Sequence, residues 1–229
     1  MSLPERSITI LIAALGGEGG GVMADWLIDA SARCGFASQS TSIPGVAQRT
    51  GATTYYLEIY PATAAQLNGR QPVFSLTPSP GNVDIMVASE LIEAGRAMQN
   101  GYVSPERTTL VASTHRIYAT IEKMQMADGR FDSARVIDAG KQLAKQAILF
   151  DMRKLAQDSG TVINAVLFGA MAGSGVLPLT REACEQAIRG GGRGAEASLR
   201  GFAAGCDIAA GSKPTPLPPV PQKKASELK

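Results

Sequence analysis

The sequence predicts an α/β fold: a Rossmann-like, mostly parallel sheet flanked by helices, with a helical C-terminal portion. Short continuous apolar runs, the first at residues 7–15, are typical of strands buried on both faces of a parallel sheet. A glycine cluster at residues 16–21 follows this run and opens a segment with helical spacing. From residue 140 onward the pattern becomes mainly helical, which predicts the C-terminal portion.

The N-terminal part of the chain is predicted to form a βαβ unit. The strand at residues 7–15 leads through GGEGGG into a helix that ends near Gly35, and a second short strand is predicted at residues 36–41. The apolar stripe of the helix consists of Met23, Leu27, Ala30 and Cys34.

The middle of the chain is predicted to alternate loops and strands. Residues 42–53 are polar and interrupted by glycines, which indicates a loop. The run TTYYLEIY at residues 53–60 is rich in β-branched and aromatic residues, which favours a strand. Residues 61–81 are predicted to be mostly loop, and buried strands are predicted at residues 83–88 and 108–112.

A helix is predicted directly after residues 83–88. Ser89 is its predicted N-cap, and Glu90 lies in the first turn, where the helix dipole stabilises an acid. Glu93 and Arg96 are spaced i, i+3 and are interpreted as an ion pair on the helix surface.

The last third of the chain is assigned mainly to helices. A short strand is predicted at residues 136–138. Residues 139–150 and 161–172 have a helical pattern and are apolar nearly all round, which indicates that at least the second is a buried helix. Thr180 is predicted to cap a further helix, which GGGRG at residues 190–194 ends. The apolar stripe of this helix consists of Ala183, Cys184, Ala187 and Ile188. A last helix is predicted after GGGRG, and its apolar stripe consists of Leu199, Phe202, Ala203 and Cys206.

The chain is predicted to be one folded domain with a tail. Residues 1–211 hold every predicted strand and helix and are assigned to the Rossmann-like domain. Residues 212–229 are rich in Pro and Lys and are predicted to be an extended linker or disordered. The tail carries four Lys and one acid, so the overall charge of +2 comes from the tail and the body is near neutral.

The composition argues against several classes of protein. One His and three Cys argue against a disulfide framework, a zinc site and a cubane iron–sulfur cluster, so no metal site is predicted. The Cys residues form no CxxC pair and lie on apolar helix stripes, where free Cys acts as a small hydrophobic residue. The near-neutral charge argues against nucleic-acid binding. With no membrane-length apolar run and no signal-peptide pattern, the chain is interpreted as cytoplasmic, with no membrane partner.

The glycine cluster is the strongest candidate for a cofactor-binding site. Glycines after a first strand let backbone N–H groups approach an anion, and the next helix adds a positive dipole. The dinucleotide fingerprint fits only loosely, because the acid expected about 20 residues later is missing. An acid in the cluster would repel an anion, so a tight turn for close packing is the alternative interpretation. The candidate residues are Gly16, Gly17, Glu18, Gly19 and Gly20.

Two further features are candidates. Gln48 and Arg49, followed by Gly51, offer fork-shaped donors in a polar loop, which suits recognition of a carboxylate, a phosphate or a partner backbone. An exposed loop with a solvated Arg is the alternative. His115, the single His, follows the strand at residues 108–112, at the strand end where open α/β sheets bind ligands. No nucleophile is identified beside it, so a hydrogen-bonding role is favoured and no catalytic residue is assigned.

Four segments of the chain carry a resemblance to a known family. They are GGEGGG, PGVAQRTGATTYYLEIYP, VDIMVASELIEAGRA and SGTVINAVLFGAMAGSGVLPL. In this order they resemble the GGQGG turn, the AQRGG segment, the D-x5-E-x2-E-x2-R stretch and the N-x4-G-A helix of the gamma domain of 2-oxoacid:ferredoxin oxidoreductases. The resemblance spans roughly residues 8–202, and its second segment is most similar to the beta subunit of the indolepyruvate branch. Glu18 stands where the family has Gln, and Thr50 where Gly is common. The matching positions are Gly16, Gly17, Gly19, Gly20, Gln48, Arg49, Gly51, Asp84, Glu90, Glu93, Arg96, Asn164 and Gly169.

This resemblance implies a part of an enzyme that is inactive alone. The family oxidatively decarboxylates a 2-oxoacid with coenzyme A, giving an acyl-CoA, carbon dioxide and reduced ferredoxin, and the indolepyruvate branch takes aryl pyruvates. Thiamine diphosphate and the iron–sulfur clusters are held mainly by other subunits or domains, so no cofactor is implied for this chain alone. The implied partner is the chain or domain that carries those groups, with ferredoxin indirectly and coenzyme A as a further ligand. Two alternatives remain open: a stand-alone nucleotide-dependent reductase, and a CoA- or acyl-binding module.

Overall fold

The computed structural model describes residues 6–43, 52–117, 132–192 and 194–211. These residues form a six-stranded sheet with the strand order β2-β3-β1-β4-β5-β6. The predicted tail at residues 212–229 lies outside the described residues. The strands are β1 (Ile8–Leu15), β2 (Phe36–Ile43), β3 (Ala52–Thr63), β4 (Ile85–Ala88), β5 (Thr109–Ser113) and β6 (Gln146–Phe150).

The sheet is mixed, with a parallel part and an antiparallel part. Strands β1, β4, β5 and β6 pair in parallel, which agrees with the predicted mostly parallel sheet, although β6 was not among the predicted strands. The predicted βαβ unit needs a correction, because β3 lies between β1 and β2 and is antiparallel to both. The reason is burial: β3 buries Leu57 and Ile59 on one face and Tyr56 on the other, as a central strand does, whereas FASQSTSI is polar and suits an edge.

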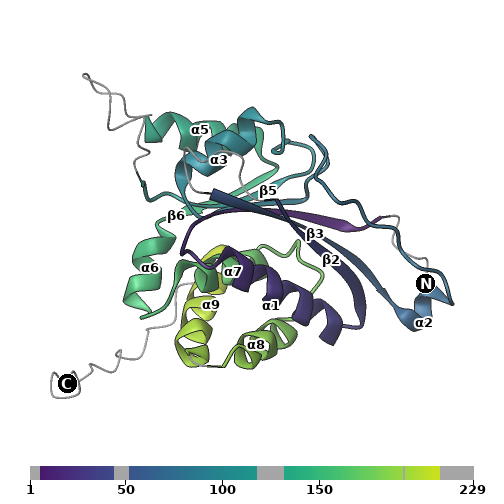
Figure 1. Ribbon diagram of the computed structural model, residues 1–229. Helices are drawn as coiled ribbons and strands as arrows, with labels where there is room; N and C mark the ends of the chain where they lie inside the picture. The colour runs from purple at the N-terminus through teal and green to yellow at the C-terminus, as the bar shows by residue number, and fades with distance from the viewer. Residues whose placement is uncertain (1–5, 44–51, 118–131, 193, 212–229) are drawn as a thin grey trace, which may run out of the picture.

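Helices cover both faces of the sheet (Figure 1). On one face lie α3 (Leu91–Gln99) and α5 (Ser133–Leu143), and the other face carries α1, α6, α7, α8 and α9. Alternate residues of β1 enter the two cores, Ile10 and Ile12 on the α1 side and Leu11 and Ala13 on the α3 side. The remaining helices are α1 (Gly20–Arg33), α2 (Ala64–Leu67), α6 (Met152–Asp158), α7 (Ile163–Gly173), α8 (Arg181–Gly190) and α9 (Ala195–Ala209).

Helices α7 and α9 cross at very short range. Gly169 of α7 and Gly205 of α9 each face the backbone of the other helix, so a Cβ at either position would overlap a carbonyl oxygen, that of Phe202 or of Val166. Beside this crossing, Phe168 packs on Phe202 with ring centroids 5.2 Å apart. Backbone-to-backbone packing therefore fixes α7 and α9 against each other.

Several predicted boundaries are wrong. Residues 136–138 belong to α5 and form no strand, and the helix predicted at residues 139–150 ends at Leu143 and gives way to β6. A short apolar run such as QAILF cannot be told from a buried helix by periodicity alone, and here its pairing with β5 makes it a strand. Glu90, and not Ser89, is the N-cap of α3, with its carboxylate accepting from the amide of Ile92 at 2.7 Å.

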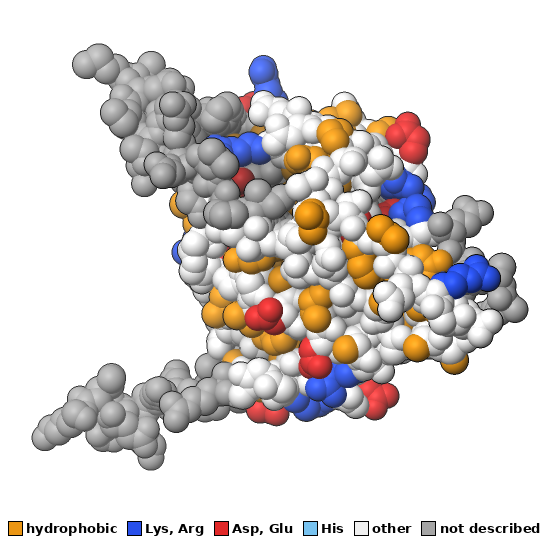
Figure 2. Space-filling view, turned by 45° about the vertical axis from the view of Figure 1, so that its right-hand side comes forward, with side chains coloured by type: hydrophobic (Ala, Val, Ile, Leu, Met, Phe, Trp, Pro, Cys, Tyr) orange, Lys and Arg blue, Asp and Glu red, His pale blue; other side chains and the backbone are white. Residues whose placement is uncertain are grey.

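The segment predicted as mostly loop at residues 61–81 is partly ordered. Strand β3 continues to Thr63, which caps α2 through a capping box with Gln66. Figure 2 shows small, separate groups of hydrophobic side chains on the face in view, with Lys and Arg side chains toward its margins. None of the helices in the described part of the chain has the length and apolarity to cross a membrane.

Candidate functional site

The carboxyl ends of β1, β4 and β5 meet at one edge of the sheet. The glycine turn, defined as residues 16–19, follows β1, while Ser89 follows β4 and His115 lies two residues beyond the end of β5. The hydroxyl of Ser89 accepts from the amide of Leu15 at 3.0 Å and so joins β4 to the entrance of the turn. This edge is the one at which open α/β sheets bind ligands.

The backbone of the glycine turn is left-handed at Gly17 (φ 83°) and Gly19 (φ 75°). At Gly19 a Cβ would stand 2.5 Å from Nδ2 of Asn164, the amide that donates to the Gly19 carbonyl at 3.2 Å. At Gly20 a Cβ would stand 2.6 Å from the Cβ of Ala14. Close packing therefore accounts for Gly19 and Gly20, whereas Gly17 has open space around it.

Two hollows lie on either side of the glycine turn. One, of about 330 Å³, lies between the turn and the start of β3, where it is lined by Thr53 and Tyr55. The other, of about 310 Å³, is bounded by Trp26, Val162 and Ile188 and reaches the starts of three helices. Glu18 lines neither hollow.

The helices that start at the second hollow share one property. Helices α1, α7 and α9 contribute Val22, Asn164 and Ser198 to its lining, all from their first turns. Their N-caps, Gly19, Val162 and Gly194, make no side-chain hydrogen bond, whereas every other helix in the described ranges has a side-chain cap. Free N–H groups with positive dipole ends suit a carboxylate or phosphate group.

The acid of the turn faces inward. Glu18 Oε1 lies 3.6 Å from Nε2 of His115, and the two side chains are 13% and 7% exposed. His115 Nδ1 is hydrogen-bonded to the hydroxyl of Ser113 at 2.8 Å, as its favoured hydrogen-bonding role predicts. Glu18 and His115 are therefore brought together, which their separate places in the sequence did not suggest.

For the second candidate loop, which contains Gln48 and Arg49, the structure describes only the flanking residues. Gln48, Arg49 and Gly51 lie outside the described residues. The next residue, Ala52, is paired with Leu15, directly before the glycine turn. The described chain thus re-enters the sheet beside the turn, at the same edge.

The acids of the third matching segment have structural contacts. Glu90 is 2% exposed and accepts from Nε of Arg116 and from the amide of Ile117, both at 3.0 Å. Glu93 and Arg96 form the predicted ion pair at 3.7 Å, but Glu93 is buried, so the pair is not purely on the surface. The Glu90 contacts tie the start of α3 to the segment that follows β5, whereas the Glu93–Arg96 pair lies within α3.

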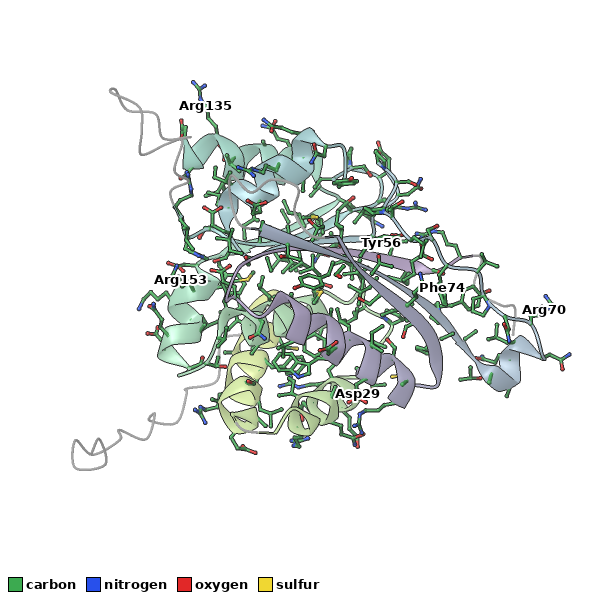
Figure 3. The ribbon with its side chains drawn as sticks, viewed as in Figure 1. Asp29, Tyr56, Arg70, Phe74, Arg135 and Arg153 are labelled. Atoms are coloured by element: carbon green, nitrogen blue, oxygen red, sulfur yellow. The ribbon has the colours of Figure 1, made fainter. Side chains whose placement is uncertain are left out.

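Asp84 anchors the opposite end of the sheet. Arg6 binds its carboxylate with two bonds of 2.6 Å, and Thr9 donates from its amide and its hydroxyl, both at 2.9 Å. Burial favours a raised pKa for Asp84, but the hydrogen bonds from Arg6 and Thr9 hold that pKa below its ordinary value. A hollow of about 430 Å³ opens beside it, lined in part by Tyr56, which lies at the sheet in Figure 3 and donates to Glu58 at 2.6 Å.

The cysteines do not form a metal centre in the described part of the chain. No group of three His, Cys, Asp or Glu side chains there is arranged to hold a metal ion. Cys184 and Cys206 are buried and Cys34 is half-buried, on the predicted apolar stripes. Burial, more than the neighbouring thiols, raises the pKa of Cys184 to about 12, which disfavours the thiolate that iron requires.

Two features of this edge were not predicted from the sequence. Ser113 was not considered, although a hydroxyl two residues before the single His was visible as SerThrHis. The shared hollow of α1, α7 and α9 was also missed, and the signal was the lack of a Ser, Thr, Asp or Asn directly before residues 163 and 195.

Residues 9–208 match the family described as pyruvate ferredoxin/flavodoxin oxidoreductase. The chain is 24% identical over 194 residues to the indolepyruvate oxidoreductase subunit IorB of Thermococcus kodakarensis, a match that covers 80% of this chain and 86% of the relative.

Two solved structures of oxidoreductase subunits share the fold of this chain. The keto/oxoacid ferredoxin oxidoreductase gamma subunit of Geobacter sulfurreducens has a TM-score of 0.58 at 18% identity, covering 90% of this chain and 99% of that one. The pyruvate oxidoreductase subunit PORC of Thermotoga maritima has a TM-score of 0.60 at 17% identity, covering 89% and 97%.

A larger enzyme contains the fold as one portion. The 2-oxoglutarate:ferredoxin oxidoreductase of Magnetococcus marinus, solved with 2-oxoglutarate, coenzyme A and succinyl-CoA bound, has a TM-score of 0.61 at 14% identity. The match covers 93% of this chain, which spans about a third (32%) of the Magnetococcus chain. With the family match over residues 9–208, the chain belongs to the pyruvate ferredoxin/flavodoxin oxidoreductase family and is a component of the 2-oxoacid:ferredoxin type of oxidoreductase.

Proposed function

We propose that residues 1–211 form the gamma-type domain of an indolepyruvate-type 2-oxoacid:ferredoxin oxidoreductase. In this role the chain supports the thiamine site of a partner chain or domain, and the whole enzyme converts an aryl pyruvate and coenzyme A into an acyl-CoA, carbon dioxide and reduced ferredoxin. The relative from Thermococcus kodakarensis, which is named for indolepyruvate, supports the choice of branch.

The redox groups of such an enzyme do not fit the described residues of this chain. The three Cys lie on or at the end of separate helices. The thiols of Cys184 and Cys206 are buried and have raised pKa values, so they are poor ligands for an iron–sulfur cluster. We therefore assign the clusters, and with them thiamine diphosphate, to the partner.

The observation that carries the proposal is the pair of hollows beside the glycine turn. They open at the carboxyl edge of the sheet, and the second one combines uncapped helix starts with apolar side chains such as Trp26 and Val162. Backbone donors of this kind bind an anionic group, and the apolar lining excludes water from it. We assign this edge to the contact with the partner and with an anionic part of coenzyme A.

The test is reconstitution with the partner chain that carries the thiamine and iron–sulfur motifs. The purified chain alone is expected to show no cluster absorbance and no thiamine diphosphate binding, and the complex is expected to reduce ferredoxin with an aryl pyruvate and coenzyme A. Arg49→Ala is expected to lower this activity, whereas Arg70→Ala, an exposed Arg at the far tip of the molecule (Figure 3), should not. A purified chain that is brown with cluster bands would contradict the proposal.

A second function, coenzyme A or acyl binding without catalysis, is favoured by the uncapped starts of α1, α7 and α9 alone. Under it, coenzyme A protects the amides of the glycine turn from hydrogen exchange in the isolated chain, and no partner adds ferredoxin reduction. The two functions are separated by whether the reconstituted complex turns over.

A further inference from the structure

The contact between Glu18 and His115 joins the glycine turn to the segment that follows β5. His115 is 93% buried as a side chain, and its Nε2 lies 3.6 Å from Glu18 Oε1. Nε2 of His115 and Oε2 of Glu18 are both buried atoms that have no hydrogen-bond partner among the described residues. An imidazole and a carboxylate therefore face each other with both side chains largely buried.

The contacts of His115 indicate which ring nitrogen carries a proton. The Ser113 hydroxyl accepts from the amide of Met152 at 3.1 Å, and an amide can only donate. The proton of this hydroxyl is then available for the second contact, that with Nδ1 of His115 at 2.8 Å. The Glu18 carboxylate can only accept, so Nε2, the ring nitrogen that faces it, is the one that carries a proton, while Nδ1 can accept from the hydroxyl.

This arrangement has a consequence for the two hollows. Gly17 and Gly19, on either side of Glu18, line the hollows, whereas Glu18 does not. An acid at a helix start would repel a bound anion if its side chain faced the same space as the free N–H groups. Here the side chain is turned toward His115, so the turn presents backbone groups alone to both hollows.

We infer that His115 is a positioning residue for the glycine turn: its imidazole, with a proton on Nε2, holds the Glu18 carboxylate away from the hollows and leaves them open to an anionic group. The functional part of this inference rests on the proposed function, whereas the position of the proton and of the carboxylate does not.

The first test uses the fact that the chain contains a single His. Nitrogen NMR of the full chain labelled at histidine is expected to show a proton on Nε2, and none on Nδ1 once the ring carries a single proton. Ser113→Ala removes the donor to Nδ1 and is expected to reduce the population of this tautomer. A wild-type protein with the proton on Nδ1 would overturn the inference, whatever the chain proves to bind.

The second test compares two substitutions of His115, each of which can place a polar group near the position of a different ring nitrogen. His115→Gln can place an amide N–H where Nε2 stands, and His115→Asn reaches only the position of Nδ1. Exchange of the Glu18 amide, which donates to Leu15 at 3.1 Å, is expected to accelerate about fivefold in His115→Asn, the equivalent of one net hydrogen bond, and to stay near wild type in His115→Gln. Equal acceleration in both would show that burial of the ring alone matters, and would overturn the positioning role.

The third test uses coenzyme A as the probe. His115→Asn is expected to weaken its binding to the full chain, and adding Glu18→Gln, which removes the released charge, is expected to restore it. Weakened binding without restoration contradicts the inference. If the wild-type chain and its reconstituted complex do not bind coenzyme A at all, the proposed ligand is wrong, and the NMR and exchange results still decide the role of His115.

Discussion

The Cα of Gly169 in α7 lies against the carbonyl group of Phe202 in α9, with no room for a single methyl group between them. This contact explains why a glycine occupies the middle of a buried helix, where it otherwise costs about 1 kcal/mol relative to alanine. Two backbones meet directly, so neither can move aside in the way a side chain can.

Gly169→Ala is therefore expected to destabilise the fold by about 1–3 kcal/mol or more, because the added methyl group forces α7 and α9 apart. Urea unfolding followed by circular dichroism measures this change. Gly95→Ala is the matched control: it also lies inside a helix, but its added Cβ would stand 3.5 Å from a Val136 methyl group, an ordinary contact. The control is expected to be neutral or to stabilise by up to about 1 kcal/mol.

The glycine turn allows backbone strain and steric clash to be separated. Gly17→Ala introduces only the cost of a left-handed residue, about 1–2 kcal/mol, since nothing lies near its Cβ. Gly19→Ala adds a clash with Asn164 and is expected to cost more. In an Asn164→Ala background the extra cost of Gly19→Ala should shrink toward that of Gly17→Ala, as a double-mutant cycle of unfolding energies would show. Equal costs for the two glycines in the wild-type background would speak against this geometry.

Asp84 is expected to make stability depend on pH at the acid end. Its folded-state pKa is lowered, so its contribution is fully present above the unfolded value near 3.8 and is lost as the pH falls through the lower folded value. Asp84→Asn is expected to cost about 1.5–3 kcal/mol at neutral pH, the range for buried bonds to a charged group. The gap to wild type should close below about pH 3.8 in denaturant titrations.

Asp158→Asn serves as the control for that titration, because the Asp158–Lys154 pair is exposed and contributes well under about 1 kcal/mol. If the stability gap between wild type and Asp84→Asn stayed constant down to the lowest pH, the Arg6 and Thr9 bonds would not be acting on the charged form.

The cysteines are expected to react unequally with a thiol reagent. Burial raises the pKa of Cys184 to about 12, so at pH 8 only about one molecule in ten thousand carries its thiolate. Mass spectrometry after brief alkylation of the native protein should find Cys184 unmodified, while the half-buried Cys34 is labelled first. In urea all three should label at similar rates. Rapid native labelling of Cys184 would contradict its burial.

The sequence predicted the parallel part of the sheet because its strands are buried on both faces and read as continuous apolar runs. β1, β4 and β5 were found for this reason, with boundaries close to those observed. QAILF was assigned to a helix because five apolar-rich residues fit either period, and only its neighbour β5 decides. The insertion of β3 beside β1 was also out of reach, since strand order depends on contacts distant in the chain.

The candidate site divides in the same way. The glycine turn was visible as a local pattern, but the Asn164 amide that binds Gly19 lies 145 residues away in the chain. The Glu18–His115 contact is equally remote in sequence and arises because β1 and β5 end at the same edge. The part played by Gln48, Arg49 and Gly51 stays a prediction.

The place of β3 in the sheet also bears on how the chain is made. Residues 8–63 can pair β1, β2 and β3 as soon as they leave the ribosome, because all partners of these contacts lie within that stretch. The other edge of β1 stays unpaired until β4 at Ile85–Ala88 has been synthesised. During that interval β1 presents an apolar, unpaired edge, and the nascent chain is most exposed to pairing with the wrong strand at that edge.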